Sequence, residues 1–512
     1  MNLAKAMATV AGLTGLSRIA GFVRDVLTAA YLGAGPLADA FFVALKLPNF
    51  FRRVTAEGAF SVAFVPLYSK ELERKGGRDA GIFAGNAFMI MLLGLSFFTM
   101  LAVTYMPYVI TAIAPGFIDD PQRFEAAVEL SRITFPYLLL MSLSALLGGM
   151  MNAHDKFAPF AFAPVLFNMS IIVALLFGTP WTGSAGHAMA WGIFLSGFLQ
   201  FFWLMACLRR YKIRLLLQKP RLTGEIRKLF RLMGPGVIGA GVMHINLFAD
   251  MIIASMLSAG SISYLYYASR LNQLPLGMVG IAVGTALLPM LSRALASHDG
   301  QKASDLFNRS LEYCLLLALP AAAALLVVPD VIIKGLFERG EFTSGDTQKA
   351  AFVLQGYAIG LPAYIFVKVF STAYWSREDT KTPVKISIIT TVLNICLSLI
   401  LIWPLGVAGI AFSTGLMGWL QVYLLKRGLK TIENTSFDDR LKRSSAKIVV
   451  ITCIMAVAVY SVSIPEWGQY QDLLACVVTG SVLYGILVFR AGLMSKEDIK
   501  TYLRRTPEIK ER

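Results

Sequence analysis

The chain has 512 residues, with 47 Lys and Arg against 31 Asp and Glu, so its formal net charge is +16. Hydrophobic residues make up 56% of the chain and charged residues only 15%, whereas soluble globular proteins carry about 25% charged residues. These few charges exclude a soluble multidomain protein, a disordered protein and a fibrous protein. The composition predicts a polytopic membrane protein.

The basic residues lie in short gaps between apolar runs, as orientation signals do in membrane proteins, so we expect no nucleic-acid partner. All five cysteines lie inside apolar runs. Their odd number and the lack of a CxxC motif exclude a disulfide framework and a zinc site. The first residues lack a small-residue cleavage site, so we interpret this stretch as the first membrane helix and not as a removed signal peptide.

Apolar runs follow one another along the whole chain. A spanning helix needs about 20 mostly apolar residues, and fourteen runs meet this requirement. The sequence therefore predicts an all-α polytopic membrane protein with fourteen transmembrane helices. The predicted spans are 8–32, 37–65, 83–112, 130–151, 159–180, 186–207, 233–257, 264–292, 310–333, 350–374, 384–403, 406–425, 446–464 and 471–493.

The charges in the gaps alternate. The gap after the sixth run holds nine Lys and Arg between residues 209 and 231 against one acid, Glu225. The gap after the third run reads PGFIDDPQRFE, and the gap after the thirteenth has no Lys or Arg. Because basic loops stay in the cytoplasm, both termini are predicted to be cytoplasmic.

Segments recur at an offset of 221–227 residues. Each copy holds six spans, so the copies share one orientation across the membrane, as in transporters whose substrate site lies between two halves. The sequence predicts two pseudo-symmetric six-helix lobes, 1–215 and 216–432, followed by two further helices in 433–512. The matched segments are FVPLYSKEL (64–72) with LLPMLSRAL (287–295), HDKFAP (154–159) with EDTKTP (378–383), and Asn168 with Asn394.

Several charged residues interrupt each of the first two apolar runs, and the eighth run adds an arginine. A charge at the bilayer centre costs about 2.5–3.5 kcal/mol, so these side chains must face protein or water. The repeat places the eighth run opposite the second, so arginines from both halves are predicted to converge on one cavity. The charged residues are Arg18, Arg24 and Asp25 in the first run, Asp39, Lys46, Arg52 and Arg53 in the second, and Arg270 in the eighth.

Arginine favours phosphate recognition, because its planar guanidinium stays charged and donates paired hydrogen bonds. The acidic residues Asp25 and Asp39 would then hold these arginines in place or pair with them when the site is empty. The alternative is that the charges extend to the helix ends or form internal pairs.

A second polar set comprises Asp250 in the seventh run, Asn394 and Ser398 in the eleventh, and Thr414 in the twelfth. Hard oxygen ligands of this kind suit a small cation such as sodium. The alternatives are helix–helix hydrogen bonding and, for Asp250, pairing with Lys368.

No nucleophile, metalloprotease or P-loop motif occurs, and the four histidines are dispersed, so we predict a protein that is not an enzyme. Without a nucleotide site, any uphill transport must use an ion gradient or the membrane potential.

The segments SRIAGFVRD (17–25), ADAFFVALKLPNFFRR (38–53), EGAFSVAFVP (57–66), SYLYYASRLNQLPLG (263–277) and REDTKTPVKI (377–386) closely resemble the MurJ (MviN) family. This family belongs to the multidrug/oligosaccharidyl-lipid/polysaccharide (MOP) exporter superfamily. The resemblance covers essentially the whole chain. It implies a lipid II flippase of peptidoglycan synthesis, which moves the undecaprenyl-diphosphate disaccharide-pentapeptide across the bacterial inner membrane.

The resemblance also implies site residues. The family's cavity arginines fall on Arg18, Arg24, Arg52 and Arg270, and its first-lobe carboxylate falls on Asp39. Its sodium site would map onto Asp250, Asn394, Ser398, Thr414 and the carbonyl of Ile410, with Ser398 replacing an acidic ligand. We expect no bound cofactor, and sodium is a candidate coupling ion. The two C-terminal helices resemble the family's groove for the lipid tail. The expected partners are lipid II and membrane lipids, and the expected state is a monomer.

Two other functions stay open at this point. Another MOP-type exporter, of polyprenyl-linked oligosaccharides or of cationic drugs, would share the fold, but a cavity for cationic drugs should be acidic or apolar. A membrane enzyme acting on polyprenyl phosphates would also use arginines, but it would need a facing carboxylate pair or histidine that the sequence does not show.

Overall fold

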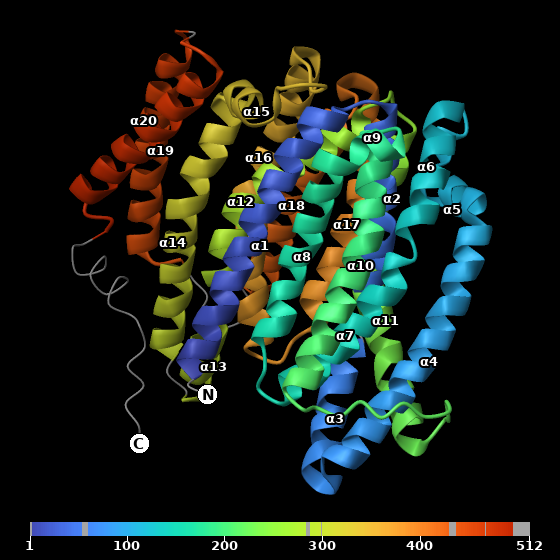
Figure 1. Ribbon diagram of the computed structural model, residues 1–512. Helices are drawn as coiled ribbons and strands as arrows, with labels where there is room; N and C mark the ends of the chain where they lie inside the picture. The colour runs from blue at the N-terminus through green and yellow to red at the C-terminus, as the bar shows by residue number, and fades with distance from the viewer. Residues whose placement is uncertain are drawn as a thin grey trace. The chain divides into compact units, whose positions relative to one another are not determined.

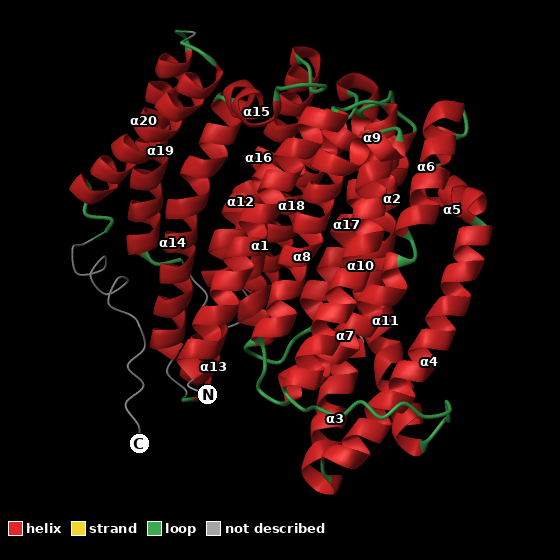
Figure 2. Ribbon diagram, in the orientation of Figure 1, coloured by secondary structure: helices red, strands yellow, loops and turns green. Residues whose placement is uncertain are grey.

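The structure is a computed structural model that describes residues 3–53, 60–282, 287–297, 300–429, 437–465 and 467–494. Every regular element in these ranges is a helix, and none is a strand, as Figure 2 shows. The all-α prediction is therefore confirmed.

Ten helices or pairs of consecutive helices in the described ranges are long and apolar enough to cross a membrane. The other four predicted runs lie on α1 (Leu3–Leu32), α2 (Pro36–Phe51), α11 (Gly224–Ser255) and α12 (Ser261–Ala282). The total of fourteen stays a prediction. The ten spans are α3–α4 (Ser61–Lys75 and Gly77–Thr104), α6–α7 (Pro121–Thr134 and Tyr137–Ala153), α8–α9 (Ala158–Val173 and Thr179–Thr182), α10 (Ala185–Arg210), α14 (Gly300–Val327), α16 (Ser344–Trp375), α17 (Lys381–Leu405), α18 (Ala408–Leu429), α19 (Asp439–Ser463) and α20 (Gln469–Arg490).

Three predicted runs are each divided into two helices near a proline. Pro107 lies in the first turn of α5 (Met106–Ile113), Pro136 separates α6 from α7, and Pro329 begins α15 (Pro329–Phe337). Proline lacks the N–H that would continue the preceding helix, but it fits a first turn. Three short elements complete the order: η2 (Pro115–Phe117), η3 (Ala174–Gly178) and α13 (Leu288–Ala296).

Backbone contacts group the chain into two compact units. Unit 1 comprises Met1–Ser263 and Arg339–Phe342. Within it α1 packs on α8, α2 packs on α6, and α10 packs on both α7 and α8. An apolar cluster around Phe64, Leu146 and Met150 fills the space where α3, α4, α7 and α10 meet. In Figure 1, α3 and the start of α4 lie at one end of this unit and α5 at the other.

Unit 2 comprises Tyr264–Glu338 and Thr343–Arg512. Here α18 packs between α16 and α17, and α14 packs on α16 and α19. The two C-terminal helices α19 and α20 pack on each other beside α14 (Figure 1). Unit 1 includes α11, which the repeat assigns to the second lobe. The predicted domains 1–215, 216–432 and 433–512 therefore describe the repeat and not this grouping, and they stay a prediction.

The predicted repeat has a local structural counterpart in two loops. After α7, the backbone N–H groups of Asp155 and Lys156 donate to the carbonyls of Asn152 and Met151. The corresponding loop after α16 makes the same two bonds, from Glu378 to Trp375 and from Asp379 to Tyr374. Asp155 and Glu378 both adopt a positive φ, of 59° and 62°. The two turns share their conformation at an offset of 223 residues, one residue off the match of HDKFAP with EDTKTP, and this supports the internal repeat.

We predict that Gly415→Ala destabilises unit 2. A Cβ at Gly415 would lie 2.6 Å from the carbonyl oxygen of Gly356, so α18 would have to move away from α16, at a cost of about 1–3 kcal/mol. Thermal unfolding in detergent measures the loss. The control is Gly485→Ala on α20, where no atom lies within 4 Å. Equal melting temperatures of the two variants would contradict the prediction.

Candidate functional site

Arg24 on α1 is buried in an ion pair. Its guanidinium donates to the Asp25 carboxylate (Nη2 to Oδ1, 2.7 Å) and to Oδ1 of Asn168 on α8 (2.9 Å). Its carbon Cζ lies 5.9 Å from the centre of the Phe167 ring. Arg24 is 5% exposed and Asp25 is 3% exposed. The pair therefore fixes α1 against α8 and keeps a full positive charge inside a membrane helix.

The other arginines of unit 1 are more accessible. Arg18 is exposed on α1, two helical turns before Asp25. Arg52 follows the last residue of α2, and its Nε donates to Oδ1 of Asn49 at 3.1 Å. Arg53 is exposed. Of the four arginines that the sequence predicts for the site in unit 1, Arg24 is buried with protein partners, and Arg18, Arg52 and Arg53 have accessible surface.

Opposite charges on α2 and α11 act on each other. The ammonium of Lys46 and the carboxylate of Asp250 attract each other, and Asp39 also acts on Lys46. The Oδ1 atom of Asp250 is buried and has no hydrogen-bond partner within the described part of the chain. Lys368, the partner that the sequence suggests for Asp250, belongs to unit 2, so this pairing stays a prediction.

Asp39 on α2 caps the start of α12. Its carboxylate accepts hydrogen bonds from the backbone N–H of Gly260 (2.8 Å) and from both the N–H (2.9 Å) and the hydroxyl (2.7 Å) of Ser263. The side chain is fully buried. A carboxylate at this position satisfies N–H groups of the first turn and interacts favourably with the positive end of the helix dipole.

Arg270 belongs to unit 2, on α12. Its guanidinium carbon lies 5.2 Å from the centre of the Tyr266 ring, within the distance of a cation–π interaction. Arg270 is partly exposed. Since the remaining predicted arginines lie in unit 1, the convergence of arginines from both halves stays a prediction.

Three of the predicted sodium ligands of unit 2, Asn394, Thr414 and Ile410, make hydrogen bonds within the protein. The Ser413 hydroxyl lies 2.8 Å from Oδ1 of Asn394, and the Thr414 hydroxyl donates to the carbonyl of Ile410 at 2.9 Å. Ser398 is buried, and its Oγ has no hydrogen-bond partner among the described residues.

The sodium site stays a prediction. Hard oxygen ligands such as carboxylate, hydroxyl and carbonyl oxygens suit a small cation. The ligands of unit 2 are neutral, and the positive charge of Lys46 acts on the one carboxylate of the set, Asp250, which disfavours a second cation there. Nor does any group of three His, Cys, Asp or Glu in the described ranges have the arrangement of a metal site.

One buried cation was not predicted from the sequence. Arg123 on α6 is 3% exposed and donates to the carbonyls of Ser255 (2.6 Å) and Leu257 (2.9 Å) at the end of α11. Its Nε lies 3.7 Å from Asp120, and the guanidinium lies 4.2 Å from the centre of the Phe117 ring. The only sequence signal is an arginine in the otherwise uncharged or acidic gap PGFIDDPQRFE.

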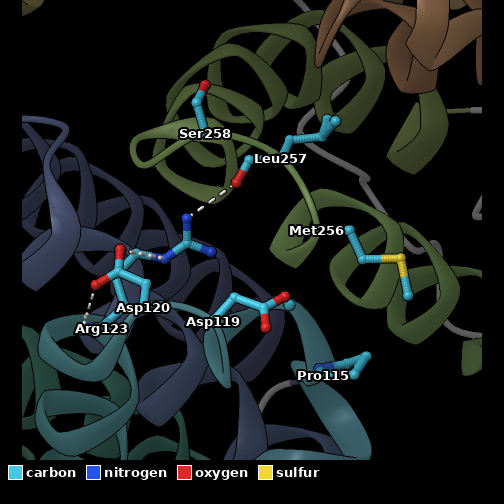
Figure 3. Close-up of a pocket in the computed structure, with 8 residues that line it drawn as sticks. Pro115, Asp119, Asp120, Arg123, Met256, Leu257 and Ser258 are labelled. Carbon is cyan, nitrogen blue, oxygen red and sulfur yellow. Dashed lines mark hydrogen bonds and ion pairs between the residues drawn. The ribbon is translucent and has the colours of Figure 1, made fainter.

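Arg123 lines a cavity of about 560 Å³ within unit 1. Figure 3 shows its guanidinium reaching from α6 toward the carbonyl of Leu257, with the side chains of Asp119 and Asp120 beside it. The cavity lining comprises Pro115, Gly116, Asp119, Asp120, Arg123, Met256, Leu257 and Ser258.

Comparison with known sequences identifies one family. A family model described as lipid II flippase MurJ matches residues 28–476. A probable lipid II flippase MurJ of Rhizobium meliloti (strain 1021) is 41% identical over 465 residues, which cover 90% of this chain and 86% of the relative. The corresponding protein of Rickettsia prowazekii (strain Madrid E) is 32% identical over 494 residues, or 96% and 97% of the two chains.

Solved structures give the same result. A lipid II flippase MurJ in an inward closed conformation superposes with a TM-score of 0.80 at 28% identity, covering 95% of this chain and 99% of that one. An inward-facing multidrug transporter of the MATE family, in the MOP superfamily, has a TM-score of 0.67 at 14% identity over 84% and 99% of the two chains. The second similarity concerns the fold alone.

We predict that Asp39→Ala lowers the stability of unit 1. The substitution leaves the N–H groups of Gly260 and Ser263 without their acceptor, and loss of a helix cap costs about 1–2 kcal/mol. Thermal unfolding in detergent is the measurement, with the exposed Glu125→Ala on α6 as the charge-matched control. An Asp39→Ala protein as stable as the control would show that the cap contributes nothing.

Proposed function

The chain belongs to the lipid II flippase MurJ family, a family of membrane transporters and not of enzymes, and we propose that it moves lipid II across the bacterial inner membrane. The lipid would enter from the cytoplasmic face and leave at the extracytoplasmic face, with no covalent bond changed. The observation that carries this proposal is the family match over residues 28–476. The retention of charged arginines in its first helices supports it.

The diphosphate of lipid II is the group that we expect the arginines to bind. A diphosphate carries several negative charges, and moving them through a low-dielectric region requires compensating donors. Arg18 has exposed surface on α1, and Arg270 is partly exposed on α12. Paired N–H donors of guanidinium groups match phosphate oxygens in geometry and charge.

Arg24 would act differently from these two. Its donors are occupied by Asp25 and Asn168, so a phosphate oxygen would have to replace a carboxylate oxygen. We propose that Asp25 holds Arg24 in place while the site is empty, and that the Arg24–Asp25 ion pair breaks when the diphosphate of lipid II binds Arg24. Exchange of one anion for another keeps the guanidinium paired throughout.

Alternating access would expose the bound headgroup first to one face and then to the other. In this proposal the lobes 1–215 and 216–432 rock against each other, as parallel repeats do in other transporters. The prenyl tail would stay in the bilayer along α19 and α20, which pack beside α14. Both termini would lie in the cytoplasm, and the protein would act as a monomer.

A drug exporter is the alternative within the superfamily, because multidrug transporters share this fold. The charge of the first helices favours the flippase. A site for cationic drugs requires acidic or apolar walls, whereas α1 and α2 contribute Arg18, Arg24, Lys46 and Arg52.

We predict that Arg270→Ala abolishes lipid II flipping while the protein still inserts and folds. The substitution removes a guanidinium group that is proposed to bind the diphosphate of lipid II. Proteoliposomes containing labelled lipid II measure the protected fraction over time. Arg132→Ala, which removes an exposed arginine of α6, is the matched control. Flipping by Arg270→Ala at the wild-type rate would refute the assigned role.

Arg24 needs a paired design, since Arg24→Ala leaves Asp25 buried and uncompensated, at a cost of about 3–5 kcal/mol. The double variant Arg24→Gln with Asp25→Asn removes both charges and keeps hydrogen-bonding groups. We predict that it melts closer to wild type than Arg24→Ala does but does not flip lipid II. Flipping by the double variant would show that Arg24 acts only in folding.

We further predict that sodium is not required. Because the positive charge of Lys46 acts on Asp250 and disfavours a second cation there, replacing sodium by potassium on both sides of the proteoliposome membrane should leave the flipping rate unchanged. A rate that falls severalfold without sodium, and recovers when sodium is added, would establish a sodium step.

A further inference from the structure

Two tight turns of unit 1 contact the ends of helices that are distant from them in the sequence. The first turn is η2, which lies against the end of α11. The N–H of Gly116 donates to the hydroxyl of Ser255 at 3.2 Å. A Cβ on Gly116 would lie 2.5 Å from the backbone nitrogen of Met256. The two backbones are therefore in direct contact, and only glycine permits this approach.

The second turn comprises residues 339–342 and contacts the end of α1. The N–H of Glu341 donates to the carbonyl of Ala30 at 2.9 Å. A Cβ on Gly33 would lie 2.5 Å from the carbonyl oxygen of Glu341, and a Cβ on Gly340 would collide with the carbonyl of Ala30. Gly33 and Gly340 have positive φ angles of 64° and 59°, which glycine adopts without strain.

The two contacts are related by the internal repeat. Gly340 follows Gly116 by 224 residues, and Ser255 follows Ala30 by 225, both within the range of the repeat offset. In each repeat a turn at this position therefore contacts the end of the other repeat's first helix. The bonds differ, because the N–H of Gly116 donates to the hydroxyl of Ser255 and that of Glu341 donates to the carbonyl of Ala30. We call these contacts the η2 clasp (Gly116 with Ser255 and Met256) and the 340 clasp (Gly340 and Glu341 with Ala30 and Gly33).

Arg123 strengthens the η2 clasp. Its two hydrogen bonds to the carbonyls of Ser255 and Leu257 place a cation at the negative end of α11, where carbonyls lack helical partners. The equivalent position of the second repeat is Asp346, which instead accepts from the Tyr264 hydroxyl. The second repeat therefore has no arginine at the position of Arg123.

We propose that the two clasps together form the extracytoplasmic gate of the flippase, and that Arg123 is the positioning residue that holds this gate closed. The inference rests on the proposed function, because alternating access requires the repeats to part at one end, and on the predicted topology, which places the gap containing η2 outside the cytoplasm. Because each repeat contacts the other through one clasp, the two repeats separate at this end only when the contacts of both clasps are broken.

Arg123 has alternative partners when the gate opens. Asp120 already lies 3.7 Å from its Nε, and Asp119 and Asp120 line the same cavity, as Figure 3 shows. A guanidinium that leaves the α11 carbonyls would pair with these carboxylates and stay compensated. The exchange lowers the cost of opening and gives Arg123 two paired states.

Hydrogen–deuterium exchange of the purified protein tests the coupling without any substrate. The informative amides are Glu341 N–H, in the 340 clasp, and those of residues 253–260, in the η2 clasp. We expect Arg123→Ala to speed exchange at both clasps by about tenfold, since two charge-assisted hydrogen bonds are lost. Arg123→Lys should fall between this variant and the wild type, and Arg132→Ala on the same helix should leave exchange unchanged.

A backbone variant gives an independent measurement. Gly116→Ala forces the η2 clasp apart and should also speed exchange at Glu341, whereas Gly35→Ala, with no atom within 4 Å of its Cβ, should not. Faster exchange confined to residues 253–260 in both Arg123→Ala and Gly116→Ala would overturn the proposal, because the contact would then be local. So would unchanged exchange at both clasps.

The result is separable from the proposed function. If exchange becomes faster at both clasps in the variants but the wild type does not flip lipid II, the proposed gate is supported and the proposed substrate is wrong. If the wild type flips lipid II and the clasps respond separately, the flippase assignment stands and the gate fails.

Discussion

The structure depends on one constraint: a charged group within a membrane helix must have a partner inside the protein. Arg24 meets this requirement with Asp25 and Asn168, and Lys46 meets it with Asp250. Each pairing also fixes a helix, because Asn168 is on α8 and Asp250 is on α11. An unpaired charge at the bilayer centre costs about 2.5–3.5 kcal/mol, so these pairs decide which helices can be neighbours.

The same constraint provides a physical basis for transport of an anionic lipid. An arginine can exchange a carboxylate or carbonyl partner for a phosphate oxygen, so its charge is never unpaired in the low-dielectric interior of the membrane. Arg24 with its carboxylate and Arg123 with its carbonyls both have this property, one near the predicted substrate site and one at the proposed gate. In each case a change of partner, and not a change of charge, would accompany the change of state.

Much of this was accessible from the sequence. The apolar runs predicted where the helices lie, and charges in the first runs predicted that acidic residues would pair with arginines there. The repeat predicted two copies of one arrangement, and the two equivalent loops share a turn. The long-range partners were not predictable. Asp39 caps a helix that begins at Ser261, and Arg123 binds backbone carbonyls that no side-chain pattern reveals. The action of Lys46 on Asp250 was not predicted either, since fold geometry and not sequence spacing brings charges together.

The central claim is that guanidinium groups of this protein bind the diphosphate of a polyprenyl lipid. Native mass spectrometry of the purified protein with undecaprenyl diphosphate, undecaprenyl monophosphate and the neutral alcohol tests it most directly. We predict binding in the order diphosphate, monophosphate, alcohol, with a preference of at least about tenfold at the first step that disappears when Arg18 and Arg270 are both replaced by alanine. Equal binding of all three lipids, or an unchanged preference in the double variant, would contradict it.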